Sequence, residues 1–195
     1  MILNDDQIAQ LCQDSDTPMI APFRSHQVRQ TDKGAPAISS GVSSFGYDIT
    51  LSSEGLRGFW HLGELIDPKA FIDSTLVDIK AHVDKRETFY ILPPNTYALG
   101  VTNETFHLPM DVMAICYCKS TYARCGLIVN TTPLEPAWRG RLVLEFYNAT
   151  RRPLKLYANE GIAQVVFFRG NRPRTTYADR SGKYQDQKGI VTARI

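Results

Sequence analysis

Several features that define common protein classes are missing from this sequence of 195 residues. It has no run of about 18 apolar residues, so we expect no membrane-spanning helix. Residues 1–6 lack a basic segment followed by an apolar one, which argues against a secretory signal. The net charge is only +2, so we expect no bulk binding to nucleic acid or membranes, and any anion site should be local. We therefore expect a cytoplasmic protein, in the host cytoplasm if the source is viral.

The sequence also lacks the residue spacings of three familiar kinds of site. Its four cysteines and four histidines show no metal-type spacing, so we expect reduced thiols in or near the core and no metal site or disulfide. Lys119 and Ser120 invite a P-loop interpretation, but Met113 and Cys118 occupy the two glycine positions of that motif. The zinc-deaminase signature H-x-E…P-C-x-x-C is absent, so a hydrolytic deamination would need a carboxylate-activated water.

Helical periodicity is scarce, whereas short apolar segments bounded by glycine and proline are frequent. Residues 4–14 predict a short helix capped by Asn4 or Asp5, and one helical turn is expected at 120–125. Residues 24–43 are interpreted as a surface loop and 52–70 as irregular. Residues 112–117 predict a strand that is buried on both faces. Other strands are predicted at 43–51, 89–92, 97–102, 127–130, 141–148, 154–157 and 163–168.

The composition, 43% hydrophobic and 22% charged, is that of an ordinary globular domain. We expect a single domain over residues 1–195, built as an all-β barrel or sandwich. Its last 25 residues are polar and aromatic without a core period. They are interpreted either as a loose tail or as a mobile lid over an anionic ligand, at about residues 170–195.

A lysine, two hydroxyls and an arginine gather within residues 119–124. Ser120 and Arg124 suit a phosphorylated ligand, and a helical turn beginning at Ser120 would add free backbone N–H groups; a surface turn with solvated charges is the alternative. About twenty residues later, Glu145 shares a strand face with Val143 inside an apolar segment. A carboxylate on a largely covered face must be paired, protonated or functional, and Arg124 is its expected partner. We expect both features to share one pocket, with Glu145 as a general base.

Several segments, in the same order along the chain, resemble the dCTP deaminases of the trimeric dUTPase-like superfamily. They are CKSTYARCGLIVN at 118–130, PLEPAWRG at 133–140, VLE at 143–145, YANEGIAQ at 157–164, SFGYD at 44–48, and the tail pattern TYADR…GKYQ at 176–185. The resemblance spans nearly the whole chain and is diffuse over 52–88.

The resemblance implies a mainly β fold, a distorted β-barrel or jelly-roll of the dUTPase-like type with a short N-terminal helix and a C-terminal lid. It implies a homotrimer with active sites shared between subunits. The implied reaction is zinc-free hydrolysis of the 4-amino group of dCTP to give dUTP and ammonia, on the route to dUMP and dTTP. It further implies that the substrate carries Mg²⁺ on its triphosphate and that dTTP is a candidate inhibitor.

The resemblance also assigns roles to individual residues. Glu145 would take a proton from the attacking water and return it to the leaving amine, while Ser120 and Arg124 would orient the site. The residues implied to line it are Lys119, Ser120, Thr121, Tyr122, Ala123, Arg124, Glu135, Val143, Leu144, Glu145, Gln164, Tyr177, Lys183 and Gln187.

Two positions depart from the family pattern. Cys118 stands where the family usually has glycine, and Thr131 stands where many members that only deaminate have an apolar residue. These departures leave open a bifunctional deaminase that also cleaves dUTP to dUMP, or a deaminase of 5-methylcytosine or other altered cytosine nucleotides. A pyrophosphatase without deaminase activity, a nucleotide sensor and a β-sandwich interaction module are the competing classes.

Overall fold

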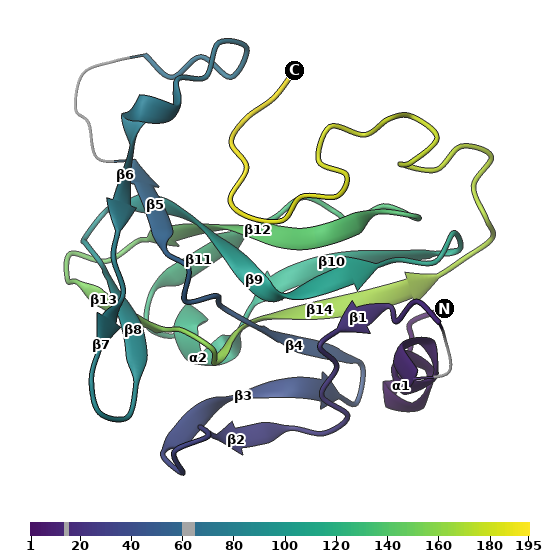
Figure 1. The fold of residues 1–195 in the computed structure, drawn as a ribbon, viewed down its shortest axis with the longest axis horizontal. Helices are drawn as coiled ribbons and strands as arrows, with labels where there is room; N and C mark the ends of the chain where they lie inside the picture. Colours follow the sequence, from purple (N-terminus) through teal and green to yellow (C-terminus); the bar gives the residue numbers. More distant parts are fainter. Residues whose placement is uncertain (14–15, 60–64) are drawn as a thin grey trace.

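The computed structural model describes residues 1–13, 16–59 and 65–195, and strands dominate its fold (Figure 1). No helix among these residues is long and apolar enough to cross a membrane. The elements, in chain order, are α1 (Asp5–Gln13), β1 (Ile20–Ala21), β2 (Val28–Gln30), β3 (Pro36–Ser43), β4 (Gly46–Thr50), β5 (Leu56–Phe59), the 3₁₀ turn η1 (Asp73–Thr75), β6 (Leu76–Ile79), β7 (His82–Val83), β8 (Thr88–Leu92), β9 (Tyr97–His107), β10 (Val112–Cys118), α2 (Ser120–Ala123), β11 (Leu127–Asn130), β12 (Arg139–Asn148), β13 (Leu154–Tyr157) and β14 (Gly161–Arg169).

Within the described residues the strands form three sheets. The first has the order β11-β12-β9-β5-β6 with β1 beside β9, the second β10-β14-β4-β3-β2, and the third β13-β8-β7. The first two enclose one core, to which Phe146 of β12, Tyr47 of β4 and Phe167 of β14 all contribute without measurable exposure. The expected mainly β, distorted jelly-roll fold with a short N-terminal helix is confirmed, although the sheets do not close into a barrel.

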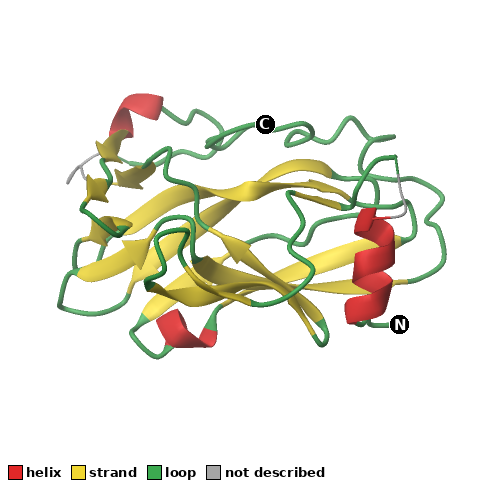
Figure 2. Ribbon diagram, turned by 60° about the horizontal axis from the view of Figure 1, so that its bottom comes forward, coloured by secondary structure: helices red, strands yellow, loops and turns green. Residues whose placement is uncertain are grey.

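Alternating burial along β12 positions the candidate site. Leu144 and Phe146 point into the core and are fully buried, whereas Val143 and Glu145 lie on the opposite, half-covered face. The tail that follows β14 returns across this face of β12 (Figures 1 and 2). The sequence-predicted alternation of this strand is therefore correct.

The two short helices also agree with prediction. Asn4 caps α1, because its side-chain oxygen accepts the backbone N–H of Gln7 at 3.0 Å while the Gln7 side chain accepts the N–H of Asn4 at 3.1 Å. The turn expected at 120–125 is α2. All four cysteines are free thiols.

Three strand interpretations were wrong. Residues 24–43, interpreted as a surface loop, contain strands β2 and β3. Strand β3 forms because it pairs with β4, and this pairing buries Ser40 and Val42. The interval 52–70 contains β5, which pairs with β6 and β9; residues 60–64 of that interval lie outside the described part. Strand β10 is not covered on both faces, since burial alternates along it and Tyr117 is exposed.

Candidate active site

Glu145 lies in the middle of β12 with a strand on each side. Asn130 of β11 is its cross-strand partner on one side, and Leu99 of β9 on the other. The side-chain amide of Asn130 donates a hydrogen bond to Glu145 Oε2 at 2.6 Å. The neighbouring strands thus hold one oxygen of the carboxylate in a fixed direction.

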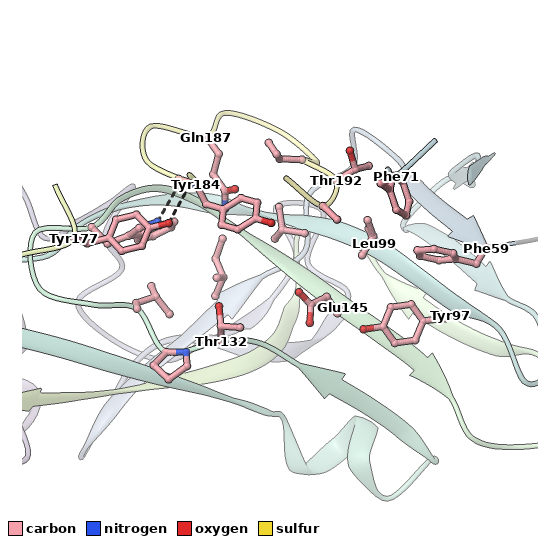
Figure 3. Close-up of a pocket in the computed structure, with 17 residues that line it drawn as sticks. Phe59, Phe71, Tyr97, Leu99, Thr132, Glu145, Tyr177, Tyr184, Gln187 and Thr192 are labelled. Carbon is pink, nitrogen blue, oxygen red and sulfur yellow. Dashed lines mark hydrogen bonds between the residues drawn. The ribbon is translucent and has the colours of Figure 1, made fainter. Parts of the chain in front are cut away.

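A cavity of about 300 Å³ opens above this face of β12, and Glu145 points into it (Figure 3). Phe59, Phe71 and Tyr97 form an aromatic end, in which the rings of Phe59 and Tyr97 meet edge-on at 5.6 Å between centroids. The tail supplies the other wall through side chains that include Tyr177, Tyr184, Gln187 and Thr192. The part of the cavity lined by described residues is therefore mostly apolar, with the Glu145 carboxylate at its centre.

The surroundings of Glu145 disfavour its charge. Burial raises the pKa of this carboxyl, and the Asn130 hydrogen bond partly opposes the shift. Burial and the nearby Glu145 charge likewise raise the pKa of Tyr97. Among the described residues, no lysine or arginine lines the cavity. The pKa of Glu145 is thus shifted in the direction that favours general acid–base catalysis near neutral pH.

The tail docks on the first half of β12 through backbone and side-chain contacts. Gln187 bridges to Gly140 in parallel, and its carbonyl accepts the N–H of Arg141 at 2.8 Å. The indole of Trp138 donates to the carbonyl of Tyr184 at 3.0 Å. Residues 184–187 therefore extend the sheet locally and cover the cavity.

Residues 119–124 lie away from this cavity, at the end of β10 and in α2. Lys119 Nζ lies 2.5 Å from Asp48 Oδ2, and both side chains are nearly covered. The hydroxyl of Tyr122 is buried and accepts the backbone N–H of Tyr157 at 2.8 Å. Ser120 and Arg124 are exposed.

One chain therefore unites only part of the predicted set. Val143, Glu145, Tyr177 and Gln187 line the cavity, whereas Leu144 points into the core. Arg124 does not meet Glu145 within one chain, because the cross-strand neighbour Asn130 makes that contact. Three other predicted site residues lie outside 119–124 and do not line the cavity. Glu135 pairs with Arg180, and the ammonium of Lys183 donates to the carbonyl of Arg194. The side-chain amide of Gln164 donates to Ser43 Oγ.

The sequence interpretation missed Asn130, Tyr97, Trp138, Tyr184 and the aromatic pair Phe59 and Phe71. Asn130 was detectable in principle, since it ends one predicted strand and Glu145 lies in the next. The β11–β12 register that makes them neighbours, however, is a tertiary property. Phe59 lies in an interval interpreted as irregular.

The two departures from the family pattern have simple surroundings. Cys118, at the end of β10, pairs regularly with Ala163 of β14. Its φ is not positive, so the backbone at this position does not require glycine. Thr131 donates its hydroxyl to the carbonyl of Cys116 at 3.3 Å. This hydroxyl is engaged by the backbone.

The described residues contain no group of three or more His, Cys, Asp or Glu side chains placed to hold a metal.

Comparison with known proteins places the chain in a family. A family model described as dCTP deaminase-like matches residues 2–170. The chain belongs to the dCTP deaminase-like family. The family match ends just before the tail, so the cavity-lining residues between Tyr177 and Ala193 lie outside it.

Individual dCTP deaminase-like relatives are similar over most of their length. A protein of Alcanivorax borkumensis named dCTP deaminase is 47% identical over 178 residues, or 90% of either chain. One of Campylobacter concisus with the same name is 49% identical over 179 residues, covering 91% of this chain and 90% of the relative.

A solved structure supports the fold. The crystal structure of 2'-deoxycytidine 5'-triphosphate deaminase from Agrobacterium tumefaciens is similar with a TM-score of 0.53 at 21% identity. The similar region covers 87% of the present chain but only 48% of the Agrobacterium tumefaciens chain.

Proposed function

We propose that the protein is a cytoplasmic dCTP deaminase that hydrolyses dCTP to dUTP and ammonia, on the route to dUMP and dTTP. One observation carries the proposal: Glu145, the one carboxylate of the described residues that lines the cavity, is half-buried and faces a largely apolar space in a chain of the dCTP deaminase-like family. The relatives at 47% and 49% identity, both named dCTP deaminase, support the same substrate.

The proposed chemistry uses Glu145 as a proton shuttle. The carboxylate takes a proton from water as the water oxygen attacks C4 of cytosine, and then delivers that proton to N3. The hydroxyl proton of the tetrahedral intermediate next passes through Glu145 to the 4-amino group, which leaves as ammonia while C4 becomes a carbonyl. The raised pKa supports both halves of this cycle, because a carboxyl that titrates closer to neutral pH both accepts and donates readily.

The reaction needs no zinc in this proposal, since the activated water is produced by Glu145. Mg²⁺ would enter with the substrate and neutralise part of the triphosphate charge. The nucleotide would lie between the tail and β12, with Tyr177 and Gln187 contacting it and the tail excluding water. Glu135 and Lys183 would contribute through the tail that they contact.

The triphosphate requires a second source of positive charge. No described cation lines the cavity, whereas Ser120 and Arg124 are exposed on another part of the chain. We propose a homotrimer in which residues 119–124 of one subunit complete the Glu145 cavity of its neighbour. This arrangement supplies both features that the sequence predicted for a single pocket.

Mixing two inactive variants tests the shared site. The Glu145→Gln and Arg124→Ala proteins are purified separately. They are then mixed in equal amounts under conditions that allow the trimers to exchange subunits. Each mixed trimer should regain roughly one intact site in three, because one junction combines the intact Arg124 with the intact Glu145. Activity that stays at the level of the separate variants would contradict a shared site, provided that native mass spectrometry shows mixed trimers.

The wild-type protein tests the function itself. It is incubated with dCTP, dCMP, dUTP and 5-methyl-dCTP, with and without Mg²⁺ and with dTTP as a candidate inhibitor, and the products are separated by chromatography. Ammonia and dUTP from dCTP are the expected products. Formation of dUMP and pyrophosphate would support the bifunctional alternative, and preferential turnover of 5-methyl-dCTP would support a modified substrate. Nucleotide binding without ammonia release would contradict the proposal.

A further inference from the structure

Asn130 makes the hydrogen bond that fixes Glu145, although the sequence analysis assigns it no role in the site. It is the last residue of β11, the edge strand of the first sheet, and lies directly opposite Glu145. Its amide nitrogen lies 2.6 Å from Glu145 Oε2. The side chain is otherwise exposed in one chain, so it contributes little to the core.

The geometry divides the work of the carboxylate between its two oxygens. Oε2 accepts the Asn130 amide, whereas Oε1 accepts no hydrogen bond from the described residues and belongs to the side chain that points into the cavity (Figure 3). An amide N–H can only donate, so the bond favours the ionised carboxylate, the form that accepts a proton from water. A bond at one oxygen also restricts rotation of the carboxylate about its last torsion angle.

We infer that Asn130 is a positioning residue for the deamination, which aims Glu145 Oε1 at the water and favours the ionised form of Glu145. This inference rests on the proposed role of Glu145. Asn130 does not line the cavity, and besides Glu145 its side chain interacts with the phenol of Tyr97.

The other titratable groups around Glu145 do not supply this effect. Tyr97 lies on β9, Tyr147 on the same face of β12, and Tyr177 and Tyr184 on the tail. A tyrosine side chain has no cationic form, so none of these residues supplies a positive charge that would favour the ionised carboxylate. No lysine or arginine from the described part of the chain lines this cavity. Among the described residues of one chain, Asn130 therefore makes the main interaction that opposes the effect of burial.

The test is the pH dependence of kcat/KM for dCTP in Asn130→Ala, Asn130→Asp and Asn130→Gln. Loss of the amide should move the acidic limb of the profile to higher pH by roughly one unit, which is the effect expected for one hydrogen bond to a charged group. Asn130→Asp should move it further, because a second carboxylate disfavours ionisation of Glu145. Asn130→Gln keeps the donor and should recover part of the shift. Asn171→Ala, at an exposed asparagine of the tail, is the matched control.

A positioning role further predicts that Asn130→Ala lowers kcat more than it raises KM, while the melting temperature stays within the range of the control. An unchanged acidic limb in both Asn130→Ala and Asn130→Asp would overturn the inference. Failure of the underlying function would be recognised separately: wild type would release no ammonia, or Glu145→Gln would remain active. If Glu145→Gln is inactive and the Asn130 variants keep the wild-type profile, the inference alone fails.

Discussion

Replacing Asp48 with asparagine removes the charge that holds Lys119 at the start of α2. The two side chains are only 7% and 12% exposed, and their charged atoms lie 2.5 Å apart. Removing one member leaves a covered ammonium without its counter-charge, which typically costs about 3–5 kcal/mol. We expect Asp48→Asn to cost about 3 kcal/mol, the lower end, because the amide oxygen still accepts a hydrogen bond. For a chain of this length, that loss lowers the melting temperature by roughly 6–12 °C.

Urea unfolding at one fixed protein concentration measures this loss, since the stability of an oligomer depends on concentration. Glu54→Gln is the matched control, because Glu54 pairs with Arg141 at 62% exposure and should cost less than about 1 kcal/mol. Adding Lys119→Met to Asp48→Asn should restore part of the lost stability, since no uncompensated charge then remains. The reasoning is refuted if Asp48→Asn costs no more than Glu54→Gln.

Three further variants test other parts of the account. Burial raises the pKa of Glu104, so the folded protein holds the proton of this carboxyl more tightly than the unfolded chain does. The free energy of unfolding should therefore fall as pH rises from about 4.3 through the raised pKa. Glu104→Gln should flatten this part of the pH–stability curve in urea titrations. A Cβ at Gly140, which has φ of +139°, would lie 3.0 Å from the Gln187 backbone, so Gly140→Ala should weaken tail docking and raise KM; an unchanged KM would argue against the tail as a lid. Leu144→Ala should cost about 3 kcal/mol, whereas the same change at Leu65, 92% exposed, should be nearly neutral in thermal unfolding.

Local signals predicted much of the fold. Alternation identified the two faces of β12, and the capping pattern at Asn4 marked the start of α1. Strand β3 was missed because its small polar residues are buried by pairing with β4, not by their own hydrophobicity. Where burial comes from long-range pairing, composition is a weak guide.

The candidate site shows the same limit. Glu145 stood out because a lone carboxylate in an apolar strand is unusual, and the structure does place it in a cavity. Its partner was predicted wrongly: Arg124 was chosen for its positive charge, but the strand register brings the neutral Asn130 to Glu145. The contribution of Trp138 and Tyr184 depends on how the tail folds back, which no local pattern contains.

Turnover of dCTP by Glu145→Gln tests the central claim most directly. The glutamine keeps the size of the side chain but cannot shuttle a proton, so ammonia release should fall by at least about 10²–10⁴-fold while the melting temperature is retained. Glu87→Gln makes the same chemical change in the turn between β7 and β8, away from the cavity, and should leave turnover unchanged. Near-normal ammonia release by Glu145→Gln would contradict the account.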